Sequence, residues 1–311
     1  GVTVCISLLT ISFTTANTVF YLGQVIYGFG LACIMCTDFP LITSLVAPHQ
    51  KQVGYNLTIF IYFLTSVIGN LFAGFFPQLF PVLTNPYQIL LVISALSYLT
   101  LGFARIRLPR RSSPDNVKVH LLEVLWSRDV LSFLLFGFVT MTIFNSIMSM
   151  LNLILRQRYG LSDSLIGSLF SLISIVGSVA VPVVSLIGQK YSYRSIASAT
   201  LVLQMLAILS MAFAPAGLFV LLVCARTMTT NFVYSVVDSP MLQSVNMECR
   251  GTYQGLRISA NYIGMSLGSA ISGFFISKDM YASLFLVAGA LCVAQNLIFH
   301  YICVPHIRNY E

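Results

Sequence analysis

The chain has 311 residues, of which 57% are hydrophobic and 8% are charged, and its mean hydropathy is +0.88. Because soluble globular domains carry about 25% charged residues, this composition excludes a soluble protein and indicates that most of the surface faces the lipid bilayer. The net charge of +7 is spread over the connections between apolar runs and forms no basic stretch interleaved with aromatic residues, so we expect no nucleic acid among the partners.

Ten apolar runs follow one another along the chain, separated by polar connections. A helix that crosses a bilayer needs about 20 mostly apolar residues, and every run except the first approaches or exceeds that length. We expect transmembrane helices at residues 1–15, 18–46, 57–80, 86–104, 129–154, 163–188, 195–213, 217–245, 255–277 and 281–304. The sequence therefore predicts an all-α integral membrane protein with ten transmembrane helices.

Lysine and arginine residues are divided unevenly between alternate connections. Cytosolic loops are enriched in these residues, so their distribution predicts the orientation. One side carries Lys51, Arg105, Arg107, Arg110, Arg111, Lys118, Arg128, Lys190, Arg194, Arg250, Arg257 and Arg308, and the other carries Arg156, Arg158 and Lys278. We therefore expect a multi-pass protein of the cell membrane, with the connection at 105–128 and the C-terminus in the cytosol.

Two motifs recur at a nearly constant offset. Asp38-Phe39-Pro40 and Asp238-Ser239-Pro240 each lie inside an apolar run, 200 positions apart. At an offset of 199, the glycines Gly69 and Gly74 have counterparts in Gly268 and Gly273. A repeat of this kind indicates two related halves. We predict a partial N-terminal half at 1–104, a basic cytosolic linker at 105–128 and a C-terminal half at 129–311.

The repeat also predicts how the halves are built. The two Asp-x-Pro motifs lie in the second and the eighth expected helix, so the repeating unit has six helices and the halves are parallel, related by an axis along the membrane normal. The second half contains six expected helices and the first contains four. We therefore expect that two helices are missing from the N-terminus of the sequence.

Local motifs support a family resemblance. Gly28-Phe29-Gly30, then Pro40, then Pro48 before a basic loop, resemble the fourth helix of the major facilitator superfamily. The loop Gly188-Gln189-Lys190-Tyr191-Ser192-Tyr193-Arg194 is similar to that family's G-x-x-x-D-R-x-G-R-R motif, with glutamine in place of the acid and serine in place of the glycine. The resemblance implies a pseudo-two-fold helical bundle that covers the family's third to twelfth helices.

The resemblance further implies that the runs at 18–46, 129–154 and 217–245 line a central cavity. Two of these runs carry polar residues at helical spacing, which places them on one face. The predicted substrate-cavity residues are Thr142, Asn145 and Asn152 in one run and Asn231, Tyr234 and Asp238 in the other. The alternative is hydrogen bonding between neighbouring helices, which is common in membranes.

Arg226 is a further predicted substrate-cavity residue. It lies about ten residues into its run, roughly 14 Å from the outer end at 1.5 Å per residue, which is too deep for its side chain to reach the membrane surface easily. One interpretation is a site for an anionic part of the substrate. The other is a structural ion pair or hydrogen bonds to carbonyl groups of a neighbouring helix.

Asp38 and Asp238 lie closer to the predicted cytosolic side. A carboxylate inside an apolar span is energetically costly and usually functional, so one hypothesis is that these residues carry the protons that couple transport. The alternative is a cytosolic gate, in which they form ion pairs with basic residues of the loops. The candidate partners are Lys51, Lys190, Arg194 and Arg257.

The predicted function is that of a secondary active transporter, which moves a small organic solute by alternating access. Proton-coupled export is the first hypothesis, and uptake by symport or uncoupled facilitated diffusion are the alternatives. An integral membrane enzyme or a receptor is the rival class, but the four histidines are dispersed and no H-E-x-x-H, G-x-S-x-G or P-loop motif occurs. We expect a monomer without a metal, a cofactor or catalytic residues.

Overall fold

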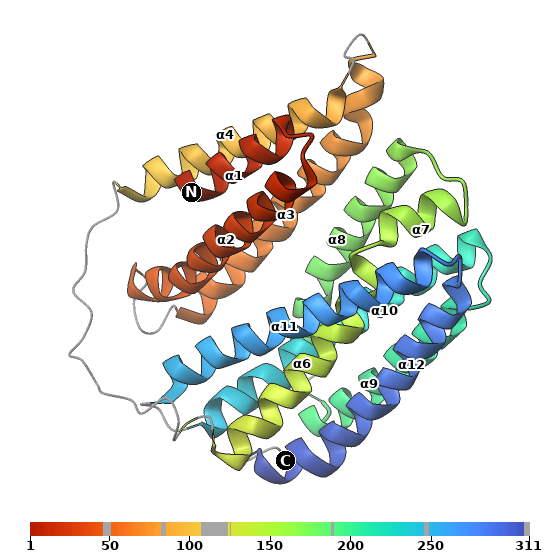
Figure 1. The fold of residues 1–311 in the computed structure, drawn as a ribbon. Coiled ribbons are helices and arrows are strands. Elements are labelled where there is room, and N and C mark those ends of the chain that lie inside the picture. Colours follow the sequence, from red (N-terminus) through yellow and green to blue (C-terminus); the bar gives the residue numbers. More distant parts are fainter. Residues whose placement is uncertain are drawn as a thin grey trace. The chain divides into compact units, whose positions relative to one another are not determined.

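The computed structural model describes residues 1–45, 51–81, 85–106, 124, 126–187, 190–245 and 249–307, which are mostly helical and contain no strand (Figure 1). The chain divides into two compact units, Gly1–Thr65 with Gly69–Asn116, and Ser66–Ile68 with Val117–Glu311. Most of the predicted linker, Pro48, Arg308 and the side chains of Asp38 and Lys51 lie outside what is described, so the predictions made for them are not tested.

The first unit contains four helices: α1 at Val2–Phe13, α2 at Asn17–Leu45, α3 at Lys51–Leu79 and α4 at Pro86–Ile106. Helix α1 packs against both α2 and α4. The small core of the first unit consists of Val4, Cys5, Leu8, Ile34 and Ala95. A Cβ atom on Gly30 would lie 2.7 Å from the Val4 side chain, so the absence of a side chain at this glycine lets α2 approach α1 closely.

The second unit consists of helices that pack side by side (Figure 1). They are α6 at Arg128–Met148, α7 at Leu151–Gln157, α8 at Asp163–Ile187, α9 at Tyr193–Met211, α10 at Ala216–Ser244, α11 at Arg250–Ile276 and α12 at Tyr281–Leu297, followed by a π-helix, η3, at Ile298–Cys303 and a short 3₁₀ turn, η4, at Val304–His306. Most of these bounds lie within a few residues of the expected ones.

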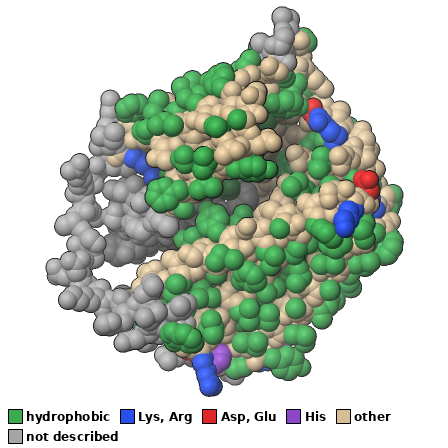
Figure 2. Space-filling model, in the orientation of Figure 1, with side chains coloured by type: hydrophobic (Ala, Val, Ile, Leu, Met, Phe, Trp, Pro, Cys, Tyr) green, Lys and Arg blue, Asp and Glu red, His purple; other side chains and the backbone are tan. Residues whose placement is uncertain are grey.

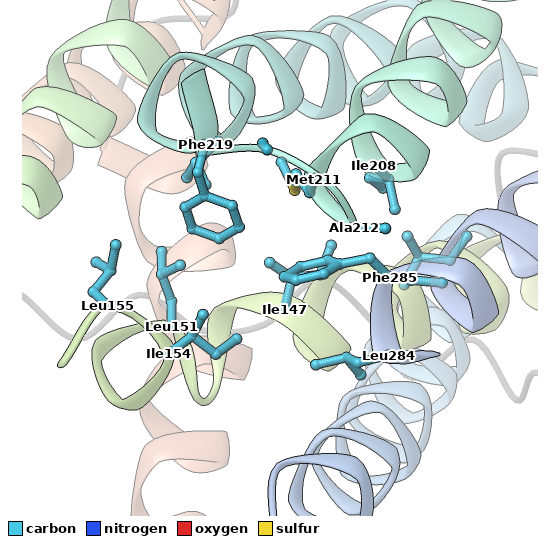
Figure 3. Close-up of a cluster of buried hydrophobic side chains, with 14 of the residues drawn as sticks. Ile147, Leu151, Ile154, Leu155, Ile208, Met211, Ala212, Phe219, Leu284 and Phe285 are labelled. Atoms are coloured by element: carbon cyan, nitrogen blue, oxygen red, sulfur yellow. The ribbon is translucent and has the colours of Figure 1, made fainter. Parts of the chain in front are cut away.

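Two apolar clusters form the core of the second unit. One lies around Phe133, Phe136, Val237 and Phe299. The other includes Ile147 and Leu151 from the α6–α7 region together with Phe219 of α10 and Phe285 of α12, whose rings pack at 5.6 Å between centroids (Figure 3). Helix α6 contributes residues to both clusters, and it packs along α11 and α12 and also contacts α10.

Seven helices of the described part of the chain are long and apolar enough to cross a membrane. They are Asn17–Ile34, Pro86–Arg105, Arg128–Gln157, Asp163–Val184, Arg194–Met211, Ala216–Asp238 and Tyr281–His306. Helix α1 has only 12 residues, and α11 carries Arg257 and Asn261 within its length. The expected count of ten is therefore not confirmed. On the face drawn in Figure 2, hydrophobic side chains cover much of the described surface and the few charged side chains lie near helix ends.

The expected single helix at 129–154 is wrong in one respect, because it is broken between α6 and α7. Met150 leaves the helical conformation, with φ −119° and ψ 14°. The Asn145 carbonyl oxygen accepts from both the Ser149 hydroxyl, over 2.6 Å, and the Ser149 backbone N–H, over 3.3 Å, immediately before this break. Asn152 therefore does not continue the stripe of Thr142 and Asn145, and its carboxamide oxygen accepts from the Leu153 N–H instead.

Candidate functional site

An ion pair joins two of the predicted coupling or gate residues. Asp238 of α10 pairs with Arg257 of α11, and the side chains are 34% and 13% exposed. The pair is therefore partly withdrawn from solvent, where the attraction between opposite charges is stronger than in water. Lys190 and Arg194, the other described candidates, are exposed at the start of α9, so of these three cations it is Arg257 that the structure places against Asp238.

Two tyrosines flank this pair, each one helical turn before a charged residue. Tyr234 precedes Asp238 on α10, and its hydroxyl donates to the sulfur of Met141 on α6 over 3.2 Å. Tyr253 precedes Arg257 on α11, is fully buried and packs edge-on against Phe133. The Tyr253 hydroxyl has no hydrogen-bond partner among the described residues. It could therefore donate a hydrogen bond to the Asp238 carboxylate after a small movement of the side chains.

Arg226 lies deeper in α10 and is fully buried. Its Nη2 atom donates to the carbonyl oxygen of Phe144 over 3.1 Å, and its guanidinium carbon lies 4.6 Å from the centroid of the Phe144 ring. Its Nε and Nη1 atoms have no partner among the described residues. The carbonyl contact is one of the structural interactions considered from the sequence, but it satisfies only part of the guanidinium.

The polar stripe on α6 points largely toward α11. Asn145 donates through Nδ2 to the Met265 carbonyl oxygen over 2.8 Å and to the Ser269 hydroxyl over 2.6 Å. Thr142 is buried and donates to the Phe138 carbonyl oxygen of its own helix. The Asn145 contacts join α6 to α11, as the alternative of hydrogen bonding between helices expects, whereas the Thr142 bond stays within α6. Asn231 is half-buried on α10. The cavity role of all these residues stays a prediction.

The comparisons with known proteins decide the family. The family model of the major facilitator superfamily matches residues 1–268. The chain belongs to the major facilitator superfamily.

A solved structure is similar to the chain. The Escherichia coli fucose:proton symporter superposes with a TM-score of 0.65 at 13% sequence identity, over 96% of this chain and 80% of the symporter. At this identity the likeness shows the fold alone. No curated protein matches the sequence. Family membership identifies a multi-pass membrane protein of a transporter family, and it points away from an enzyme.

Several residues of this superfamily member were not expected from the sequence. Phe144 lies over Arg226, and Tyr253 lies beside the ion pair. The spacing of Tyr253 and Arg257, four residues apart on one helix, could have indicated that they share a face. Nothing in the sequence distinguishes Phe144 from the other 22 phenylalanines, because its role depends on the packing of α6 against α10.

Proposed function

We propose that the protein is a secondary active transporter that moves a small organic solute by alternating access, and that protons drive it. Membership of the major facilitator superfamily supports transport. The observation that carries proton coupling is the Asp238–Arg257 pair, since it is a titratable carboxylate held against a cation on a neighbouring helix and partly withdrawn from solvent.

The chemistry of the pair explains how a proton could act. When Asp238 is ionised, its attraction to Arg257 holds α10 against α11. A proton on Asp238 removes that charge and leaves a weaker hydrogen bond between the Arg257 cation and a neutral carboxyl group, so the two helices can separate. A change in the attraction between two helices can shift the population of two conformations. Tyr253, whose hydroxyl lacks a partner among the described residues, can then donate to the carboxyl group of Asp238.

Export is the direction we propose, and uptake is the alternative. The similar solved structure is named as a proton symporter, which keeps uptake by symport as a direct competitor. Uncoupled facilitated diffusion, the other alternative, would use the same fold without protonation and deprotonation of Asp238. We also propose that the protein is a monomer in the cell membrane. Basic residues concentrate in the connection at 105–128, which supports a cytosolic location for this linker.

The proposal is tested by flux across a membrane. The full-length protein is reconstituted in liposomes with a pH gradient, and movement of protons is followed while a library of labelled small solutes is supplied. Proton coupling predicts that at least one solute causes proton movement and accumulates against its own gradient, with protons moving opposite to the solute for the proposed export and in the same direction for uptake by symport. Transport that only equilibrates the solute would leave the uncoupled facilitator, and the absence of flux for every solute would contradict the transporter class.

A further inference from the structure

The positive charge of Arg226 is not balanced by any acidic side chain that the structure describes in the second unit. Each of the four has another partner. Asp129 pairs with His306, Asp163 with Arg156, Asp238 with Arg257, and Asp279 accepts from the Tyr281 hydroxyl. Asp238 is also twelve residues from Arg226 on the same helix, which is about 18 Å at 1.5 Å per residue.

A purely structural arginine in this position would be expected to be paired. Charged side chains inside membrane-spanning helices are costly and are usually paired with one another or with carbonyl groups. Arg226 has a single carbonyl partner, at one of its three nitrogens, and the remaining two nitrogens are buried without a partner among the described residues. The guanidinium therefore has hydrogen-bonding capacity left for an acceptor that is itself negatively charged.

The side chain that stacks over Arg226 belongs to a face of α6 that is partly exposed. Met141, Phe144, Asn145 and Met148 recur at helical spacing and are each partly exposed, whereas the alternating positions Ile143 and Ile147 are fully buried. The Phe144 ring lies on this partly exposed face and stacks over the guanidinium. Rotation of one aromatic side chain would therefore uncover the two unpartnered nitrogens without unfolding the core.

We infer that the transported solute is an organic anion, that Arg226 is the residue that recognises its carboxylate, and that Phe144 covers Arg226 in this conformation. This inference rests on the proposed transport function. A guanidinium presents pairs of parallel N–H groups that match the two oxygens of a carboxylate. Each pair includes Nη2, which has two hydrogens, so a carboxylate can bind through Nη2 together with Nε or Nη1. The ring of Phe144 offsets part of the desolvation of the cation while no anion is bound, and the anion replaces the ring when the site opens.

The test compares carboxylates with their neutral amides. The purified full-length protein is screened by thermal unfolding against lactate and lactamide, benzoate and benzamide, and further pairs of the same design. The inference predicts that stabilising members are carboxylates and that their amides have no effect. Arg226→Met should abolish this stabilisation, and Arg226→Lys should retain it at an affinity about tenfold weaker, because lysine keeps the charge and loses the paired donors.

The covering role of Phe144 has its own variant and control. Phe144→Ala removes the ring and should raise the affinity for the same carboxylate several-fold, because binding no longer requires the covered form to open. Phe138→Ala removes an aromatic ring of equal size from the same helix, away from Arg226, and should leave the affinity unchanged. Equal effects of the two variants would overturn the covering role.

The inference as a whole can be contradicted by the same measurements. It is overturned if no carboxylate stabilises the wild-type protein, if amides stabilise it equally, or if carboxylates still act on a folded Arg226→Met protein. This outcome is separate from the failure of the proposed function. A protein that transports a neutral or cationic solute in liposomes is still a transporter, and only the assignment of Arg226 and of the substrate class would be lost.

Discussion

Gln295 of α12 donates through Nε2 to the Thr140 hydroxyl oxygen of α6 over 2.8 Å, between two buried side chains in the second unit. The Thr140 hydroxyl itself donates to the Phe136 carbonyl oxygen over 2.7 Å, so it accepts from Gln295. The bond joins two helices in the core, where a donor that loses its acceptor cannot turn to water.

Removing one partner of this bond should destabilise the protein more than removing both. Thr140→Val keeps the shape but leaves the Gln295 amide without its acceptor, which costs about 1–3 kcal/mol. Adding Gln295→Leu removes the stranded amide, and with it an oxygen that has no partner among the described residues, so the double variant should recover much of that loss. Thermal unfolding of both variants in one detergent measures the difference. A double variant less stable than Thr140→Val would contradict this account.

The close packing of α6 against α11 gives a second prediction. A Cβ atom on Gly268 would collide with the Thr142 carbonyl oxygen and lie 2.8 Å from the Ser146 nitrogen. Gly268→Ala should therefore push the helices apart and destabilise the protein by about 1–3 kcal/mol. Gly273→Ala on the same helix is the matched control, since its Cβ would meet nothing within 4 Å. We expect the control to be neutral or slightly stabilising in the same unfolding measurement.

The sequence predicted the helices of the second unit well, because long apolar runs bounded by polar residues define a membrane helix with little ambiguity. Helix α10 at Ala216–Ser244 lies within a residue of the expected 217–245. The break at Met150 could not be predicted from hydropathy, because the runs on both sides of it are equally apolar. Local hydrogen bonds of Ser149 and Asn152 accompany the break, and periodicity does not register such bonds.

The sequence predicted several of the residues that belong to the candidate site, but it predicted less well which of their side chains contact one another. Asp238 and Arg257 each appeared among the candidates, but the sequence did not separate Arg257 from Lys190 and Arg194, and only the structure shows Arg257 paired with Asp238. The polar stripe of α6 shows the same limit of prediction from the sequence. Helical spacing placed Thr142 and Asn145 near one another, but it could not show that Asn145 is used by α11, because either neighbour of a membrane helix can accept a polar side chain.

The predicted orientation is open to a direct test of accessibility. In intact cells, a membrane-impermeant thiol reagent should label a cysteine introduced at Ser162, which is exposed between α7 and α8. The same reagent should not reach cysteines at Ser192, which is exposed at the start of α9, or at Ser112 in the predicted cytosolic linker. Labelling after permeabilisation is the control that both sites can react. Modification of Ser112→Cys by the external reagent would reverse the orientation.

The last prediction separates proton coupling from gating at Asp238. Asp238→Asn imitates the neutral carboxyl group and removes the ion pair with Arg257 in both cases. If Asp238 carries the coupling proton, the variant should lose accumulation driven by a pH gradient and keep the exchange of labelled for unlabelled solute, because exchange needs no net proton movement.

If the pair instead holds a cytosolic gate closed, the same variant should favour the inward-open conformation, because nothing then holds α10 against α11. Exchange and net transport should then slow together, since the outward-facing form is rarely populated. Asp279→Asn is the control: this exposed residue has a positive φ of 54°, a conformation that asparagine also tolerates. Exchange and net uptake measured on one preparation decide between the two roles, and an Asp238→Asn protein with unchanged accumulation and unchanged pH dependence would exclude both.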